Sequence, residues 1–153
     1  MARATTQLIS KLREAAANIE SGKDYNWGHI GRCNCGHLVQ CMTDLSAKDI
    51  YAIAKDNYID EWTEFANDYC PSNGASVDKI TDILLTNGFE LKDVHQLEYL
   101  SNPDVLKAIP GGPRQLQKGN ARDAALYMRT WASILELELK AAAQNVRSQV
   151  VST

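Results

Sequence analysis

The sequence predicts an all-α fold: a compact bundle of six or seven unequal helices with an ordered Cys/His-rich loop and a long C-terminal helix. Apolar residues recur at three- and four-residue spacing in several segments, which is the period of an amphipathic helix. No run of alternating apolar and polar residues is bounded by hairpin turns. The 153 residues are 44% hydrophobic and 23% charged, as in an ordinary globular chain. We therefore expect one helical domain over residues 1–153, with a frayed tail at 147–153.

The first helix is predicted near the start of the chain, with Thr5 or Thr6 as its N-cap. It should end at Ser21-Gly22, because glycine readily takes the left-handed conformation that closes a helix. From residue 23 to 35 the chain reads KDYNWGHIGRCNC and has no sustained period. This stretch is expected to be an ordered loop.

Several shorter helices follow. Ser46 and Asp49 resemble an N-terminal capping arrangement, and helical spacing then continues up to Cys70-Pro71. Turn residues at 71–76, Asn87-Gly88 and Asn102-Pro103 divide the next part of the chain. They predict short helices over residues 76–87, 91–100 and from Pro103 onwards.

The last helix is expected to be the longest element. AIPGGPRQLQKGN at 108–120 is a loop by composition, and Asn120 with Asp123 can cap the helix that follows it. An apolar stripe then runs from Ala124 to Val146, so a helix of up to ~27 residues should span the domain. This broad stripe suits either internal packing or dimerisation.

Charge and terminal sequence limit the partners and the location. Lys plus Arg is 16 and Asp plus Glu is 19, so the net charge is −3 and no basic excess favours nucleic acid. No window approaches the ~18 consecutive apolar residues of a membrane-spanning helix. Charged residues interrupt the first twenty positions before a signal-peptide core could form. We expect a cytoplasmic protein without membrane contact.

The candidate site is the stretch NWGHIGRCNCGHLVQC, which places five soft or borderline metal ligands within thirteen residues. Asn34 can cap a helix that begins near Cys35, so His37 and Cys41 would share one face of it. Thiolate and imidazole together suit zinc, with iron as a second possibility. The predicted metal ligands are Cys33, Cys35, His37 and Cys41, with His29 and Cys70 as substitutes. Four protein ligands would make the metal structural or regulatory.

Other interpretations of the same residues remain open. The N-terminus of a helix at Cys35, near Arg32, would lower a cysteine pKa and produce a reactive thiolate. Alternatively, the cysteines are core residues, and the protein is a metal-free interaction or scaffold protein, or a homodimer joined through its last helix. His95 and Glu98 occur as a single reversed pair, which does not match a di-iron bundle, so His95 is expected to bond between helices. The standard enzyme signatures are missing, and whether the protein is an enzyme stays open.

Overall fold

A computed structural model of the chain describes residues 1–22, 24–27, 29, 31–55 and 82–151. These residues are helical or irregular and contain no strand, which confirms the all-α prediction. Residues 82–86 are helical, as predicted for the end of the helix over 76–87. The start of that helix lies outside the described residues, as do Cys70 and the segment 58–70 that was predicted to be helical. Six helices have both ends described: α1 (Thr6–Glu20), α2 (Asn34–Met42), α3 (Ala47–Lys55), α6 (Leu91–Tyr99), α7 (Pro103–Lys107) and α8 (Ala121–Val151).

Local capping explains where the helices begin. The Thr5 side chain accepts a hydrogen bond from the Leu8 N–H at 3.1 Å, as predicted for the start of α1. Ser46 and Asp49 exchange hydrogen bonds of 2.9 and 3.1 Å between backbone N–H and side chain before α3. Asn102 caps α7, whose first residue is a proline. These starts were predictable because each depends on residues a few positions apart.

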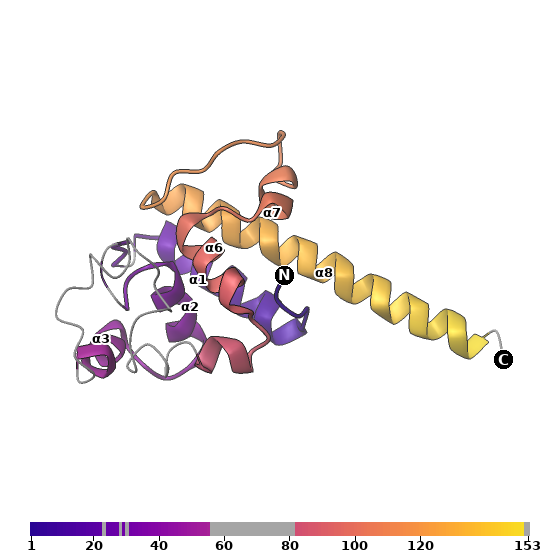
Figure 1. Cartoon of the computed structure of the whole chain (residues 1–153), viewed down its shortest axis with the longest axis horizontal. Helices are drawn as coiled ribbons and strands as arrows, with labels where there is room; N and C mark the ends of the chain where they lie inside the picture. The colour runs from indigo at the N-terminus through magenta and orange to yellow at the C-terminus, as the bar shows by residue number, and fades with distance from the viewer. Residues whose placement is uncertain (23, 28, 30, 56–81, 152–153) are drawn as a thin grey trace.

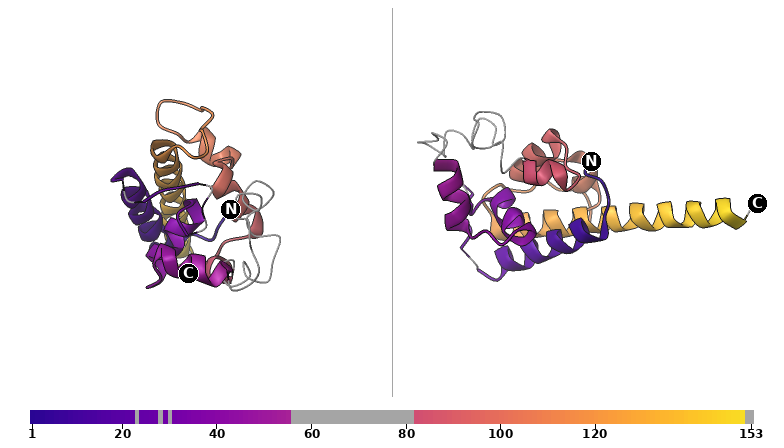
Figure 2. Two further views of the ribbon diagram at one scale, coloured as in Figure 1. Left: turned by 90° about the vertical axis from the view of Figure 1, so that its left-hand side faces the viewer. Right: turned by 90° about the horizontal axis from the view of Figure 1, so that it is seen from below.

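The helices α1 and α8 lie side by side and run in opposite directions (Figures 1 and 2). Arg13 pairs with Glu136 at 2.8 Å, and Glu20 pairs with Arg129. The partner on α8 moves back by seven residues, from 136 to 129, as the residue on α1 moves forward by seven, from 13 to 20. This antiparallel pair forms one side of the core.

Helix α2 packs against α1, α7 packs against α8, and α6 packs against α2 to complete the core. The Tyr127 hydroxyl on α8 accepts a hydrogen bond from the Asn102 N–H at 3.2 Å, just before α7. The largest fully buried side chains are Trp131, Tyr127, Leu8, Leu12, Ile19, Leu38, Ile50, Leu84, Leu97, Leu100, Met128 and Leu135. Within the described residues, no helix combines the length and apolar character that crossing a lipid bilayer requires.

The second half of α8 projects away from the rest of the molecule (Figure 1). Leu135 is the last fully buried residue of α8, whereas Leu137 is 68% exposed and Val146 is 61% exposed. The helix has 31 residues and continues to Val151, beyond the predicted start of a frayed tail at 147. We call the projecting residues 137–147 the α8 arm.

Candidate functional site

The Cys-x-Cys segment forms the N-terminus of α2. Cys33 is the N-cap, and its Sγ accepts a hydrogen bond from the Gly36 N–H at 3.4 Å. The helix therefore begins at Asn34. The sequence predicted Asn34 as the N-cap, so the observed start is one residue earlier than the predicted start. Cys33 and Cys35 are only 2% and 3% exposed. Their thiols belong to the interior of the protein.

A buried carboxyl group from α6 lies against this helix N-terminus and accepts a hydrogen bond from it. Glu98 is 2% exposed, and one of its oxygens accepts the Cys35 N–H at 2.7 Å. The Cys35 thiol lies against the same helix and donates to the Val94 carbonyl oxygen at 3.7 Å. A helix N-terminus offers unsatisfied N–H groups and a partial positive charge, which favours a carboxylate. Glu98 thus satisfies the start of α2 from another helix.

Asn34 fastens the same junction with its side chain. Its Nδ2 donates to the Leu97 and Glu98 carbonyl oxygens at 2.9 and 3.2 Å. Its Oδ1 accepts from the Tyr25 hydroxyl at 2.7 Å. The loop before α2, the helix α2 and the end of α6 are therefore joined by one buried polar network.

Burial controls the protonation of this network. Desolvation raises the pKa of Cys35, and the adjacent Glu98 raises it further. Burial also raises the pKa of Glu98, although hydrogen bonds from Cys35, Cys33 and Asn34 oppose the rise. The pKa of Tyr25 is raised by burial and by Glu98. The neutral thiol is favoured at Cys35, which is the opposite of the lowered pKa that a reactive cysteine needs.

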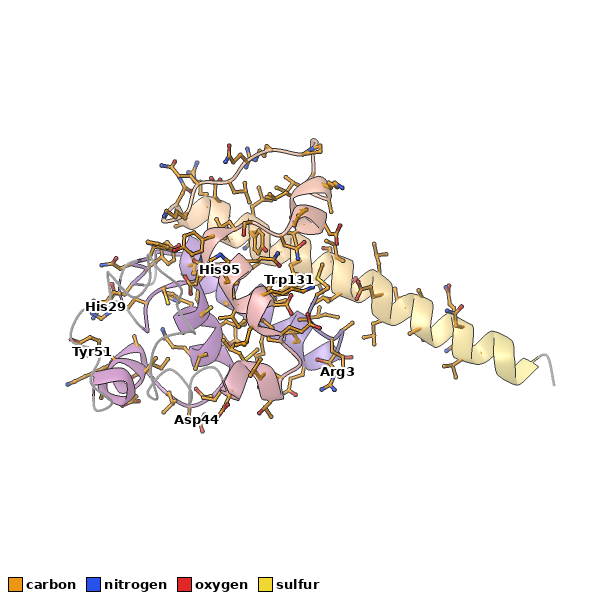
Figure 3. All side chains as sticks on the ribbon, in the orientation of Figure 1. Arg3, His29, Asp44, Tyr51, His95 and Trp131 are labelled. Atoms are coloured by element: carbon orange, nitrogen blue, oxygen red, sulfur yellow. The ribbon has the colours of Figure 1, made fainter. Side chains whose placement is uncertain are left out.

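The remaining predicted ligands lie in different places. The His37 ring bonds the Asp24 carbonyl through Nε2 at 2.8 Å. The Cys41 Sγ accepts a hydrogen bond from Asn18 Nδ2 of α1 at 3.6 Å. The His29 ring stacks on Tyr51 of α3, with centroids 5.0 Å apart, at the edge of the molecule and away from His95 (Figure 3). Each side chain has its own protein partner.

No group of three or more His, Cys, Asp or Glu side chains suited to holding a metal ion occurs in the part of the chain that the structure describes. Cys33 and Cys35 come together at Glu98, while His29, His37 and Cys41 do not join them. The zinc or iron site stays a prediction without support from this geometry. Cys70, the other substitute ligand, lies outside the described residues.

Sequence reasoning missed the role of Glu98. It treated Glu98 only as a neighbour of His95, whose ring packs on Tyr99 of the same helix with the ring centroids 4.6 Å apart. A signal was present, because Glu98 follows Leu97 and lies four residues after Val94, on the apolar face of a short helix. A carboxylate on that face requires a buried partner.

A second candidate surface lies where the α8 arm leaves the body. A groove of about 410 Å³ lies between the first half of α1 and α8, lined by Thr6, Ile9, Ser10, Arg13, Glu136, Leu139 and Lys140. Beyond the groove, Ala142, Ala143 and Val146 are exposed on the arm. They follow Leu139 at three- and four-residue spacing, so the four residues share one helix face. We call this face, comprising Leu139, Ala142, Ala143 and Val146, the arm stripe.

Comparison of the chain with protein-family models, with curated proteins and with solved structures found no match.

Proposed function

We propose that this protein is a self-associating helical interaction protein, in which two copies dock through their α8 arms. The observation that carries the proposal is that the apolar face of α8 continues past the point where α1 stops covering it. Apolar surface on a projecting helix is typical of an association site.

The second copy is the occupant that the arm suits best. The α8 arm contains one acid, Glu138, and two bases, Lys140 and Arg147, so its net charge is +1. Two identical arms therefore meet with little net repulsion, whereas a strongly charged partner such as nucleic acid would find no strong complementary field. The alanines at positions 142 and 143 leave room for close approach of a second helix.

The packing of α1 suggests the orientation of the partner. Because α1 runs antiparallel to α8 and begins near Leu139, a partner arm that runs in the same direction as α1 would cover the α8 face beyond that point. This arrangement is antiparallel and closes as a two-fold dimer. Three helical turns per copy form a small interface, below ~1,200 Å², so the expected dimer is weak and reversible.

The test compares two exposed apolar residues on opposite sides of the arm. Val146 and Leu137 are nine residues apart, which is two and a half helical turns. They are similarly exposed, at 61% and 68%. Val146→Glu changes the arm stripe, and Leu137→Glu makes the same change of charge on the other face. Sedimentation of the full chain over a wide concentration range measures the mass of each.

We expect the wild-type mass to rise from 16.9 kDa towards twice that value with concentration. The Leu137→Glu variant should behave like the wild type. The Val146→Glu variant should stay monomeric, because each dimer contains two copies and each loses about 1.5 kcal/mol of apolar burial. A wild type that is monomeric at every concentration would contradict the proposal. Equal effects of the two substitutions would also contradict it.

We further propose that the protein is cytosolic and that nucleic acid is not a partner. The net charge of −3 supports the second point, because it provides no basic excess to attract phosphate groups.

A further inference from the structure

Two aromatic side chains form a corner that holds an ammonium group. The Trp27 and Tyr99 rings meet edge to face, with centroids 5.6 Å apart and planes inclined by 74°. The Lys118 Nζ lies 4.5 Å from the Trp27 centroid and 4.9 Å from the Tyr99 centroid. Both distances are within the range of a cation–π interaction. One cation therefore faces two rings at once.

The two walls of the corner are positioned without help from Lys118. The Trp27 indole N–H donates to the Glu98 carbonyl oxygen at 2.8 Å. Tyr99 is the last residue of α6, and its ring packs against His95. The corner is thus built by the same junction that fastens α2 to α6, and it would persist if Lys118 left.

Lys118, in contrast, comes from an irregular segment that is exposed except at Leu116. Residues 113–117 form no regular structure, and Lys118 is exposed. Within the described residues it forms no ion pair. A cation–π contact at such an exposed position is worth a factor of only about two to five in occupancy. A competing cation can displace it.

A hollow lies beside the Tyr99 wall of the corner and Lys118. It measures about 470 Å³ and is lined by Tyr99, Gln115, Leu116, Gln117 and Lys118. This lining, within the described residues, contains no carboxylate that would form a salt bridge with a primary ammonium or a guanidinium. Aromatic faces without a carboxylate suit a methylated ammonium ion, whose charge is spread over methyl groups and which is weakly hydrated.

We propose that the Trp27–Tyr99 corner and its hollow bind a methylated ammonium group, and that Lys118 occupies the corner when no such ligand is present. The group is either a small choline-like ion or a methylated lysine side chain. The two share the chemistry that the rings recognise. This site is independent of the α8 arm.

Nuclear magnetic resonance of the full chain tests the proposal through the Trp27 indole N–H signal. That signal is assigned by its loss in the Trp27→Phe variant. Tetramethylammonium chloride is added to the wild type and to the Lys118→Gln variant, with sodium chloride as the salt control. Tert-butyl alcohol has nearly the same shape without the charge and serves as the matched ligand control. The Tyr99→Leu variant removes one wall, and its melting curve reports whether it is folded.

We expect a saturable shift of the Trp27 signal with tetramethylammonium and about two- to fivefold tighter binding by the Lys118→Gln variant. A folded Tyr99→Leu variant should lose the response. If neither the wild type nor the Lys118→Gln variant responds, or if tert-butyl alcohol binds equally well, the proposal is wrong. The titration is then repeated with choline and with N-acetyl-trimethyllysine amide. The ligand with the lower dissociation constant shows whether the site prefers the small ion or the lysine side chain.

Discussion

At the scale of single residues, Glu98 determines the chemistry of the α2–α6 junction. The N-terminus of α2 and two thiols stabilise its charged form, while burial destabilises that form. Burial prevails, so the pKa of Glu98 lies above its ordinary value of 4.5. The junction therefore depends on pH.

We expect the Glu98→Gln substitution to change the pH dependence of stability. The folded wild type retains a proton that the unfolded chain releases, so Glu98 lowers the free energy of unfolding as the pH rises above 4.5. Glutamine keeps an acceptor for the Cys35 N–H and cannot ionise. Urea unfolding at several pH values should show the variant gaining stability relative to wild type as the pH rises. The exposed Glu138→Gln serves as the control, and parallel curves for Glu98→Gln and wild type would contradict this expectation.

Substitutions of Cys33 distinguish a role in capping α2 from a role in binding metal. Its Sγ accepts the Gly36 N–H, and a serine hydroxyl is a strong N-cap acceptor. We expect Cys33→Ser to change the free energy of unfolding by less than about 0.5 kcal/mol, and Cys33→Ala to cost about 1 kcal/mol. Chemical denaturation measures both.

Elemental analysis of the same proteins tests the zinc prediction. Under that prediction the wild type contains about one equivalent of metal, and both substitutions at Cys33 lose metal and stability together. A stable Cys33→Ser variant from a metal-free wild type would assign the cysteines to the core.

At the scale of elements, the packing of α2 depends on one close approach of backbone. A Cβ atom added at Gly36 would lie 2.7 Å from both the Cα and the carbonyl oxygen of Gly31. Backbone atoms at that distance have to move. The Gln40 side chain holds Gly31 in place by donating to its carbonyl oxygen at 2.6 Å.

The Gly36→Ala substitution is therefore expected to destabilise the protein by about 1–3 kcal/mol. Helix propensity alone predicts the opposite sign, a gain of about 1 kcal/mol. Gly22→Ala is the matched control, because its φ is +87° and no atom lies within 4 Å of the added Cβ. It should cost about 1 kcal/mol from backbone strain alone. A stabilising Gly36→Ala in thermal unfolding would show that the loop and α2 separate easily.

The helix caps could be predicted from the sequence, whereas the contacts between distant helices could not. The caps at Thr5, Ser46 and Asn102 were predictable because each uses residues two or three positions apart. The meeting of Cys35 with Glu98 was not, since 63 residues separate them. Closeness in sequence suggested that five ligands converge, but His37 and Cys41 are directed by Asp24 and Asn18, which lie earlier in the chain.

At the scale of the whole molecule, periodicity predicted a long final helix and its apolar stripe. It could not predict where the stripe stops being covered, because that depends on where α1 begins relative to α8 in three dimensions. The ion pairs of Arg13 and Glu20 set this register. The same stripe therefore serves the core up to Leu135, is half-buried at Leu139 and faces solvent at Ala142, Ala143 and Val146.

The aromatic corner and the arm lie at opposite ends of α8, so a dimer joined through the arms would carry two widely separated binding sites. Lys118 lies three residues before α8 begins, and the arm occupies its other end. A helix rises 1.5 Å per residue, so two copies overlapping along residues 137–147 would hold their corners roughly 65 Å apart. Such a dimer could not place both sites on one small ligand. It would instead link two separate cation-bearing partners, and its reach would be set by the length of α8.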